Sequence, residues 1–323
     1  MPERNPFLLE EPAVISFSGG RTSAYLLHRT LEAYGGELPE GVRVIFCNTG
    51  KERPETLDFI ERCSQRWSVP VTWLEYWPGE NPSGKSRHWF REVNYATAAR
   101  QGEPFTTLIE ARKVPPNVRM RFCTGQLKIH TTNRYVRHEL GWTEYRNAIG
   151  LRHDEPRRVA KILAPQQTTR TVETLFGQEE ETVGRYKEEL SGEEPCCPLH
   201  RAKVTLDEIM AFWQQERGGL ALNDWLALPK AERPGWDLEL RPDEGNCDCC
   251  FLKGAGKLLE IMRERPDLAA WWIEQEEKQL GKSSHTFRND RPPYRILLEM
   301  AQQPGLDFSC FPSDPTLPCH CTD

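Results

Sequence analysis

The stretch VISFSGGRTSAYLLH, residues 14–28, passes from an apolar run to a helical pattern through two adjacent glycines. The run from Val14 to Phe17 is mostly apolar, as a buried parallel strand requires. After the glycines, apolar side chains recur at helical intervals. The stretch therefore predicts a buried strand, a tight turn at Gly19 and Gly20, and a helix, and this unit decides the fold.

The predicted turn carries groups that hold an anion. Glycine permits a positive φ and a close approach of the backbone to a ligand, and the helix start offers unpaired N–H groups and a positive dipole end. A serine-capped glycine turn is the plainer interpretation, because such turns are common. Six small or cationic residues in one turn nevertheless favour a phosphate site, and they are Ser18, Gly19, Gly20, Arg21, Thr22 and Ser23. The turn lacks the glycine spacing and the Lys-Ser/Thr ending of the Walker loop.

The composition is that of a globular protein with a sizeable core. The chain has 323 residues, of which 38% are hydrophobic and 28% charged, and no apolar stretch is long enough to cross a bilayer. The first residues lack the core of a signal peptide, so we expect a cytoplasmic protein with no membrane partner. The net charge of −6 argues against nonspecific coating of nucleic acid. In that compartment the 11 cysteines are expected to be thiols or metal ligands.

Strands and helices alternate in the first half of the chain. Apolar runs predict strands at 42–47, 69–76 and within 145–152, and helical spacing predicts helices from about residue 54 and over 123–140. This alternation predicts an α/β fold with a doubly wound, mainly parallel sheet and right-handed crossovers. Ligands bind such sheets at the carboxyl ends of the strands.

The organisation of the chain changes after about residue 161. We predict an α/β domain at 1–164, a polar insertion forming a hairpin or loop at 165–195, and a mainly helical, cysteine-rich appendage at 196–323. In the appendage, Thr205 and Glu208 form a capping-box pattern that starts a helix. Two more helices are predicted at 256–265 and 266–280.

A polar loop follows the second predicted strand. It contains Asn48, Thr49 and Gly50, and Glu52 comes shortly before the next helix. An acidic side chain in that position complements a helix N-terminus, and this is the plainer interpretation.

The stretch GLRHDEPRR, residues 150–158, brings three arginines to another predicted strand end. Guanidinium groups there bind sulfate, phosphate or a nucleic-acid backbone through paired hydrogen bonds. Surface ion pairs with Asp154 and Glu155 are the plainer interpretation. A second basic run, GKSRHWFR at residues 84–91, is compatible with a mobile substrate loop, but a solvated loop is the interpretation that we adopt.

Cysteine spacing indicates a metal centre. In GNCDCCFLKG, residues 245–254, Cys247 and Cys250 have the C-x-x-C spacing with which two thiolates bind one metal. A redox pair or half of a structural zinc site has the same spacing, and these alternatives stay open. Cys123, in RFCTGQLKIH, is a third candidate ligand.

Together these motifs resemble the phosphoadenosine-phosphosulfate (PAPS) reductase family of the adenine nucleotide α-hydrolase, or PP-loop ATP pyrophosphatase, superfamily. The resemblance runs through the Ser-Gly-Gly-x-x-Ser loop, the Asn-Thr-Gly stretch, the Cys-Thr…Lys segment, the Gly-x-Arg loop and the Gly-Asn-Cys…Cys-Phe-Leu-Lys-Gly segment. It is strongest to the branch akin to the sulfur-inserting subunit of DNA phosphorothioation systems. The Glu-Cys-Gly-Leu-His tail of true sulfonucleotide reductases is absent, and LPCHCTD offers only Cys319 and Cys321.

The resemblance implies an adenine nucleotide on the loop at 18–23, either ATP with Mg²⁺ or a sulfonucleotide, PAPS or adenosine phosphosulfate (APS). It implies that the nucleotide is lined by the six loop residues and by Thr49, Gly50, Glu52 and Arg157. It assigns catalytic work to Arg21, Ser23, Lys128 and Arg152.

The resemblance also implies an iron–sulfur cluster. Cys123 and Lys128 match the first cysteine and the lysine of the Cys-Cys-x-x-Arg-Lys segment of cluster-bearing members, whereas Thr124 stands where that segment has its second cysteine. The implied ligands of a 4Fe-4S cluster are Cys123, Cys247 and Cys250, which would leave one iron open. A fourth ligand from Cys196, Cys197, Cys249 or a tail cysteine remains an alternative.

The implied activity is cleavage of ATP to AMP and pyrophosphate, which activates a substrate for sulfur transfer. Nucleic acid is the implied acceptor, and a sulfur-donor or electron-donor protein is the implied partner. One alternative is reduction of PAPS or APS by a tail cysteine. Another is a nucleotide-binding zinc protein without turnover.

Overall fold

A computed structural model describes residues 4–79, 89–164, 167–174, 177–184, 192–242, 244–245, 247–279 and 286–305. For 167–174 and 177–184 it describes the course of the backbone. The predicted tail cysteines, Cys319 and Cys321, and most of the basic run at 84–91 lie outside the described residues. No helix in the described part of the chain is long and apolar enough to span a membrane.

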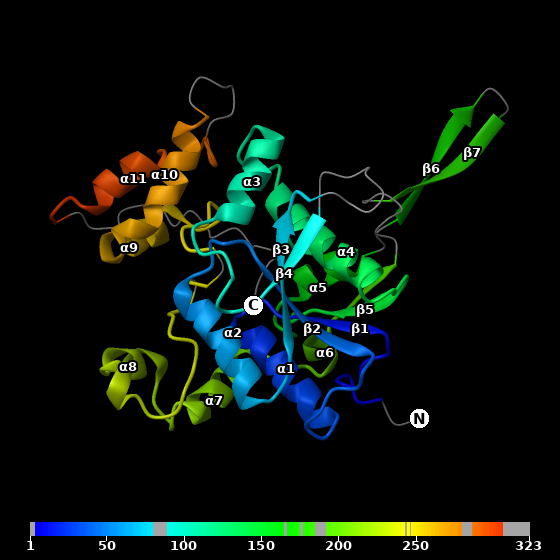
Figure 1. Ribbon diagram of the computed structural model, residues 1–323, viewed down its shortest axis with the longest axis horizontal. Coiled ribbons are helices and arrows are strands. Elements are labelled where there is room, and N and C mark those ends of the chain that lie inside the picture. The colour runs from blue at the N-terminus through cyan, green and yellow to red at the C-terminus, as the bar shows by residue number, and fades with distance from the viewer. Residues whose placement is uncertain are drawn as a thin grey trace.

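A six-stranded sheet forms the centre of the molecule, in the order β4-β3-β2-β1-β5-β8 (Figure 1). Its strands are β1 (Ala13–Ser16), β2 (Val42–Asn48), β3 (Val71–Trp77), β4 (Trp89–Val93), β5 (Tyr145–Ala148) and β8 (Glu193–Cys196). All neighbouring pairs are parallel except β3 and β4. The predicted α/β fold with a mainly parallel sheet is therefore confirmed.

The helices appear largely where helical spacing predicts them. Predicted helices appear as α1 (Arg21–Ala33), α2 (Pro54–Arg66), the π-helix η1 (Thr124–His130) with α4 (Thr131–His138), α7 (Leu206–Glu216), α9 (Ala255–Glu264), and η4 (Pro266–Ala269) with α10 (Ala270–Glu277). The structure adds α3 (Glu103–Arg112), α5 (Pro156–Leu163), α6 (Pro198–Arg201), α8 (Leu222–Ala227), the 3-10 turn η3 (Lys230–Glu232) and α11 (Tyr294–Ala301). The predicted capping box starts α7, because the Thr205 N–H donates to Glu208 Oε2 at 2.9 Å.

The interpretation of residues 84–91 as a solvated loop is wrong at its end, because Trp89 opens strand β4. Trp77 and Trp89 are paired in the antiparallel register. Phe90 is buried against Leu74 and Tyr135 in one apolar cluster. Burial of its apolar side chains therefore offsets the conformational entropy that this short segment loses when it is ordered as an edge strand.

Two cores cover the two faces of the sheet. On one face, Ile15 packs with apolar residues of α1, α2 and α7, and on the other Val14 packs with residues of α4. Neighbouring strand residues face opposite sides, which explains why a single strand supplies both cores. Each fully buried leucine or isoleucine contributes about 1.5–3 kcal/mol, so these cores hold α1 and α2 firmly at the edge where ligands bind.

A third core lies in the cysteine-rich region. It joins α3 and η1 to α9, α10 and α11, and Trp272 is fully buried at its centre. In Figure 1 the last three helices lie together beside α3. The helical C-terminal region therefore packs directly on segments that belong to the first half of the chain.

The segment between α5 and β8 contains the predicted hairpin. Strands β6 (Gln167–Thr174) and β7 (Gly177–Gly184) pair antiparallel and extend away from the body of the molecule (Figure 1). Strand β8 then pairs parallel with β5 and completes the central sheet. The division into three regions at 164 and 195 stays a prediction, and β8 crosses the second of these positions.

Candidate functional site

The loop at residues 18–23 is closed by the hydroxyl of Ser23. Ser23 Oγ accepts hydrogen bonds from the Ser18 N–H at 3.2 Å and from Ser18 Oγ at 2.9 Å, and it donates to the Gly20 carbonyl at 3.0 Å. Ser23 is buried, whereas the loop leads directly into the first turn of α1. N–H groups in a first helical turn have no carbonyl acceptor within the helix, so this turn is suited to bind an anion.

Gly19 is required in this loop for two reasons. Its φ of +80° lies in the left-handed region, and a Cβ built on it would lie 2.6 Å from Thr56 Cγ2 and 2.8 Å from Ile60 Cδ1. The start of α2 therefore packs directly against the loop. Any side chain at position 19 would push the two apart.

The Arg21 side chain leaves the loop and binds the 237–240 segment. Its Nε donates to both carboxylate oxygens of Asp237, at 2.9 and 3.0 Å, and its Nη2 donates to the Leu240 carbonyl at 3.0 Å. Asp237 also accepts a hydrogen bond from Arg217, and all three side chains are buried. Burial raises the pKa of the Asp237 carboxyl, and the two guanidinium groups oppose that shift. Sequence reasoning missed Asp237, and the catalytic role of Arg21 stays a prediction.

The Gly-x-Arg loop lies against the same turn of α1. A Cβ on Gly150 would lie 3.3 Å from Ser23 Cα, and Arg152 Nη1 donates to Thr22 Oγ1 at 3.4 Å. Arg152 Nε also donates to Asp154 at 3.0 Å. Arg152 therefore forms both the ion pair with Asp154 and the contact with Thr22 of the loop at 18–23. The structure therefore brings Arg152 beside Thr22, while Arg157 is exposed in the first turn of α5.

The loop after β2 is organised by Glu52. Its Oε2 accepts hydrogen bonds from the Thr49 N–H at 2.9 Å and from Thr49 Oγ1 at 2.8 Å. Glu52 Oε1 is buried without a hydrogen-bond partner, and Lys128 Nζ lies 3.9 Å from it. Gly50 has a φ of +78° and packs closely on Gly102. The structure thus brings Thr49, Gly50 and Glu52 together with Lys128 of η1.

The cysteine-rich segment is attached to this loop by backbone and side-chain contacts. A single antiparallel bridge pairs Glu52 with Cys247. The Asp248 N–H donates to the Lys51 carbonyl at 2.7 Å, and Lys51 Nζ lies 2.8 Å from Asp248 Oδ2. Thr49 Oγ1 lies 3.5 Å from Cys247 Sγ. Sequence reasoning missed the buried ion pair of Lys51 and Asp248, since nothing in the local pattern of either segment signals the other.

The three predicted ligand cysteines belong to one apolar cluster. Cys250 is buried in the third core, and Cys123 and Cys247 pack against it. Burial raises the pKa of the Cys247 thiol well above its usual range, and the Glu52 carboxylate raises it further. Within the described residues, no group of three or more His, Cys, Asp or Glu side chains is arranged to hold a metal ion. The three thiols therefore lie in or against one apolar core but are not arranged as metal ligands.

The other described cysteines occupy different places. Cys249 is fully buried in the third core, and burial raises the pKa of its thiol. Cys196 and Cys197 lie at the end of β8 in other clusters, where burial raises their pKa to about 11 and about 12. Cys47, which sequence reasoning missed, is the penultimate residue of β2, and its Sγ lies 3.2 Å from Thr132 Oγ1 and 3.6 Å from the Lys128 carbonyl oxygen.

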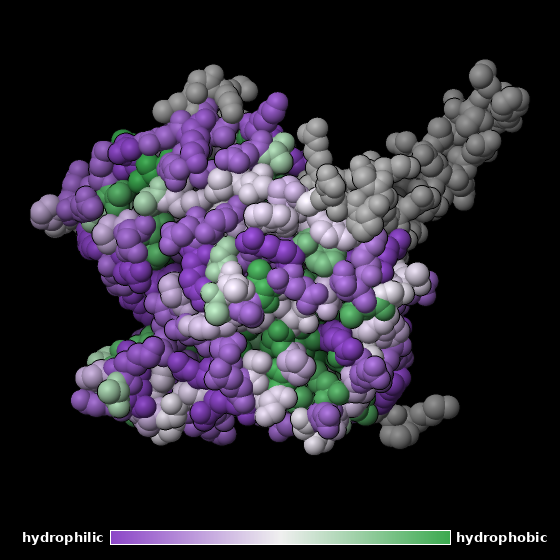
Figure 2. All heavy atoms as spheres, in the orientation of Figure 1, coloured by the Kyte–Doolittle hydropathy of each residue, from purple (hydrophilic) through white to green (hydrophobic). Residues whose placement is uncertain are grey.

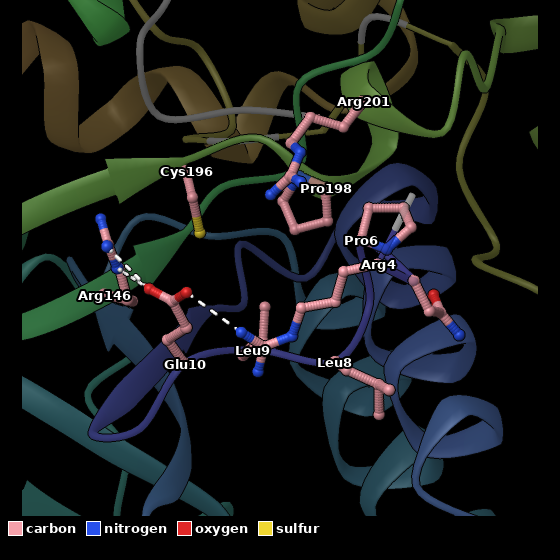
Figure 3. A pocket seen from close by; sticks show the side chains of 10 residues that line it. Arg4, Pro6, Leu8, Leu9, Glu10, Arg146, Cys196, Pro198 and Arg201 are labelled. Carbon is pink, nitrogen blue, oxygen red and sulfur yellow. Dashed lines mark hydrogen bonds and ion pairs between the residues drawn. The ribbon is translucent and has the colours of Figure 1, made fainter. Parts of the chain in front are cut away.

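A separate pocket of about 200 Å³ lies under the N-terminal segment, beside β8 (Figure 3). Arg4 and Arg146 both point to the Glu10 carboxylate, at 3.1 and 2.8 Å. Arg146 also pairs with Glu194, so Arg4 and Arg146 both have carboxylate partners, and Arg201 lines the same pocket. The face seen in Figure 2 is mainly hydrophilic, with apolar side chains gathered in patches.

Comparisons with known proteins show the family of this chain. Residues 12–202 match the phosphoadenosine phosphosulfate reductase domain. The chain is 28% identical over 248 residues to the uncharacterised nin region protein ORF290 of Escherichia phage lambda, covering 76% of this chain and 67% of that protein. A crystal structure of phosphoadenylyl-sulfate reductase from Candida auris, in complex with phosphate, aligns at 14% identity with a TM-score of 0.35, covering 66% of this chain and 80% of that chain. The chain belongs to the phosphoadenosine phosphosulfate reductase domain family.

Proposed function

We propose that this chain is an enzyme that binds an adenine nucleotide on the loop at 18–23 and uses it in sulfur chemistry. Membership of the family supports the coarse activity. The observation that carries the binding site is the closed Ser18–Ser23 loop, which ends in a helical first turn with Arg152 beside it. An anion in that position meets N–H groups, a helix dipole and a guanidinium at once.

The finer proposal is that an oxygen of the acceptor attacks the α-phosphorus of ATP and pyrophosphate leaves. A sulfide-level sulfur then replaces the adenylated oxygen, and AMP leaves with that oxygen. Backbone N–H groups of the first turn would hold the leaving phosphates and stabilise their developing charge, and Ser23 would keep the loop in shape. Arg152 and Lys128 would orient further anionic groups. Mg²⁺ would be held mostly by the phosphates and water, as this ion commonly is, so it needs no dedicated cage of side chains.

Arg21 supports anion binding from beneath the loop. Two buried guanidinium groups, of Arg21 and Arg217, share the single carboxylate of Asp237. These bonds hold the first turn of α1 against the 237–240 segment. We therefore propose that Arg21 supports anion binding by fixing the position of the helix.

The proposal includes an iron–sulfur cluster on Cys123, Cys247 and Cys250. Thiolates are the ligands that such clusters use. Cys250 belongs to the third core, Cys123 and Cys247 pack against it, and Cys247 lies beside Thr49. The donor chemistry fits, although the side chains would have to rotate toward a common centre. A bound cluster would supply electrons or sulfur. Acceptor nucleic acid and a sulfur-donor or electron-donor protein belong to this proposal.

The reductase alternative uses PAPS or APS in place of ATP and needs a nucleophilic thiol. The test is calorimetric binding of ATP, APS and PAPS to protein purified without oxygen, followed by assays of pyrophosphate and sulfite release and of iron, zinc and sulfide content. Preferred binding of ATP, with pyrophosphate release, supports the leading proposal. Preferred binding of PAPS or APS, with sulfite release, supports the reductase. Zinc without sulfide, with nucleotide bound but not turned over, supports the regulatory alternative.

A matched pair of variants ties the activity to the loop. Ser23→Ala removes a hydroxyl that donates to a backbone carbonyl within the loop. Ser64→Ala removes a hydroxyl that donates to the Val69 carbonyl at 2.7 Å, at the far end of α2. We expect nucleotide binding to be lost in the first and retained in the second. Equal affinities in the two variants would refute the assignment of the loop.

A further inference from the structure

The carboxylate of Glu75 is completely buried in strand β3 and fully hydrogen-bonded. Its Oε1 accepts from Asn48 Nδ2 at 2.6 Å and from the Ala99 N–H at 2.7 Å. Its Oε2 accepts from Arg91 Nε at 2.8 Å and Nη2 at 2.6 Å. A buried carboxylate is tolerated only when hydrogen bonds and a counter-charge offset its desolvation. A group that needs so many partners is a candidate for a specific role.

Asn48 connects the Glu75 carboxylate to the loop after β2 through hydrogen bonds. Its Nδ2 donates to Glu75 and, at 2.9 Å, to the Ala99 carbonyl, while its Oδ1 accepts from the Gly50 N–H at 3.0 Å. The two acceptors on one side and the N–H donor on the other allow a single orientation of the amide. The Asn48 amide therefore transmits the position of the Glu75 carboxylate to the backbone at Gly50.

The backbone at Gly50 is held tightly at that point. It has a φ of +78°, its carbonyl accepts from the Gly102 N–H at 2.8 Å, and a Cβ there would lie 3.0 Å from Gly102 Cα. Thr49 lies next to it and bonds Glu52, which faces Lys128. A small rotation of the Asn48 amide would therefore move Thr49 and Glu52 together.

We propose that Glu75 is a positioning residue for nucleotide binding, which it serves by holding the Asn48–Gly50 turn through the Asn48 amide. Arg91 completes the arrangement by forming the ion pair with the Glu75 carboxylate, and its guanidinium stacks on Trp77 with the ring centroid 4.0 Å away. The inference rests on the proposed binding of an adenine nucleotide. It adds that residues of β3 and β4, which do not reach the phosphate loop, determine affinity for the rest of the nucleotide.

The proposal predicts different effects of a Glu75 substitution on the binding of pyrophosphate and of ATP. Under the proposed function, pyrophosphate would occupy only the anion site formed by the loop at 18–23 and Arg152, whereas ATP would also extend over a neighbouring strand end. Glu75→Gln keeps the size of the side chain but weakens its bonds to Arg91 and disturbs the amide of Asn48. We expect this variant to bind ATP about two- to thirtyfold more weakly, the range of coupling seen through such networks, and to bind pyrophosphate as the parent protein does.

Glu239→Gln is the matched control for loss of a semi-buried ion pair. Glu239 pairs with Arg62 and Arg233 at 3.1 Å each, and its side chain is 14% exposed. We expect it to lower the Tm and to leave both affinities unchanged. Binding is measured by calorimetry well below the Tm of each variant, so that only folded protein is compared.

A double-mutant cycle tests whether Glu75 acts through Asn48. If it does, Glu75→Gln adds little to the loss of ATP affinity caused by Asn48→Ala, and the two effects are not additive. Equal loss of ATP and pyrophosphate affinity in Glu75→Gln, or strict additivity in the cycle, would overturn the inference. Failure of the parent protein to bind ATP, APS or PAPS would instead refute the proposed function, so the two failures are distinguishable.

Discussion

Replacing Asp237 by asparagine is expected to lower the free energy of unfolding by about 3–5 kcal/mol, the usual cost of removing one partner from a buried ion pair. The Asp237 side chain has no exposed surface, and its partners Arg21 and Arg217 are 9% and 2% exposed. The amide would keep the shape of the carboxylate but leave two buried guanidinium groups without a counter-charge. Their remaining acceptors are carbonyls, such as those of Leu240 and Leu220.

At about 2–4 °C per kcal/mol for a large domain, the loss corresponds to a fall in Tm of roughly 10 °C. Urea unfolding followed by circular dichroism measures the free energy, and a thermal scan measures the Tm. Asp267→Asn is the control, because Asp267 pairs with Arg265 at the surface with a side chain 60% exposed, where a pair contributes about 0–1 kcal/mol. A change of less than about 1 kcal/mol in Asp237→Asn would refute the reasoning, since it would show that the two arginines do not need this charge.

Three further predictions concern the loop, the half-buried His28 and the cysteines. Gly19→Ala should destabilise the fold by about 1–3 kcal/mol in urea unfolding and abolish pyrophosphate binding, whereas Gly36→Ala, with a φ of +104° but open space around it, should affect stability only. Burial lowers the pKa of His28 from 6.5, so the unfolded chain binds the proton more readily and native stability should fall as the pH falls through about 6.5. Replacing His28 by asparagine should remove that slope, and an unchanged slope between about pH 7.5 and 5.5 would contradict the assignment. Cys250→Ser should reduce the iron and acid-labile sulfide of anaerobically purified protein, and Cys196→Ser should not; equal contents in both would contradict the proposed ligand set.

Sequence reasoning succeeded where the signal is local. The apolar run before Gly19 and the helical spacing after it predict β1 and α1, and the capping pattern at Thr205 predicts the start of α7. These patterns depend on backbone geometry within a few residues, which the chain carries with it in any context. The same holds for Gly19, whose positive φ is a property of the turn itself.

Sequence reasoning did not find contacts between residues far apart in the chain. Nothing near Arg21 in the sequence indicates that its guanidinium binds Asp237, 216 positions away. Glu75 interrupts an apolar strand without any local sign that Asn48 and Arg91 surround it. Trp89 belongs to a run that is basic in composition, and only pairing with β3 makes Trp89 the first residue of strand β4.

The sequence by itself determined the alternation of strands and helices and the glycine loop that joins the first strand to the first helix. It also supplied the cysteines that are candidate metal ligands. The tertiary structure decided which of these groups meet: the cysteine-rich segment with the loop after β2, Lys128 with Glu52, and Glu75 with Asn48. The reason is physical. Secondary structure follows from periodic contacts between near neighbours, whereas a site is made by side chains that burial in a common core forces together.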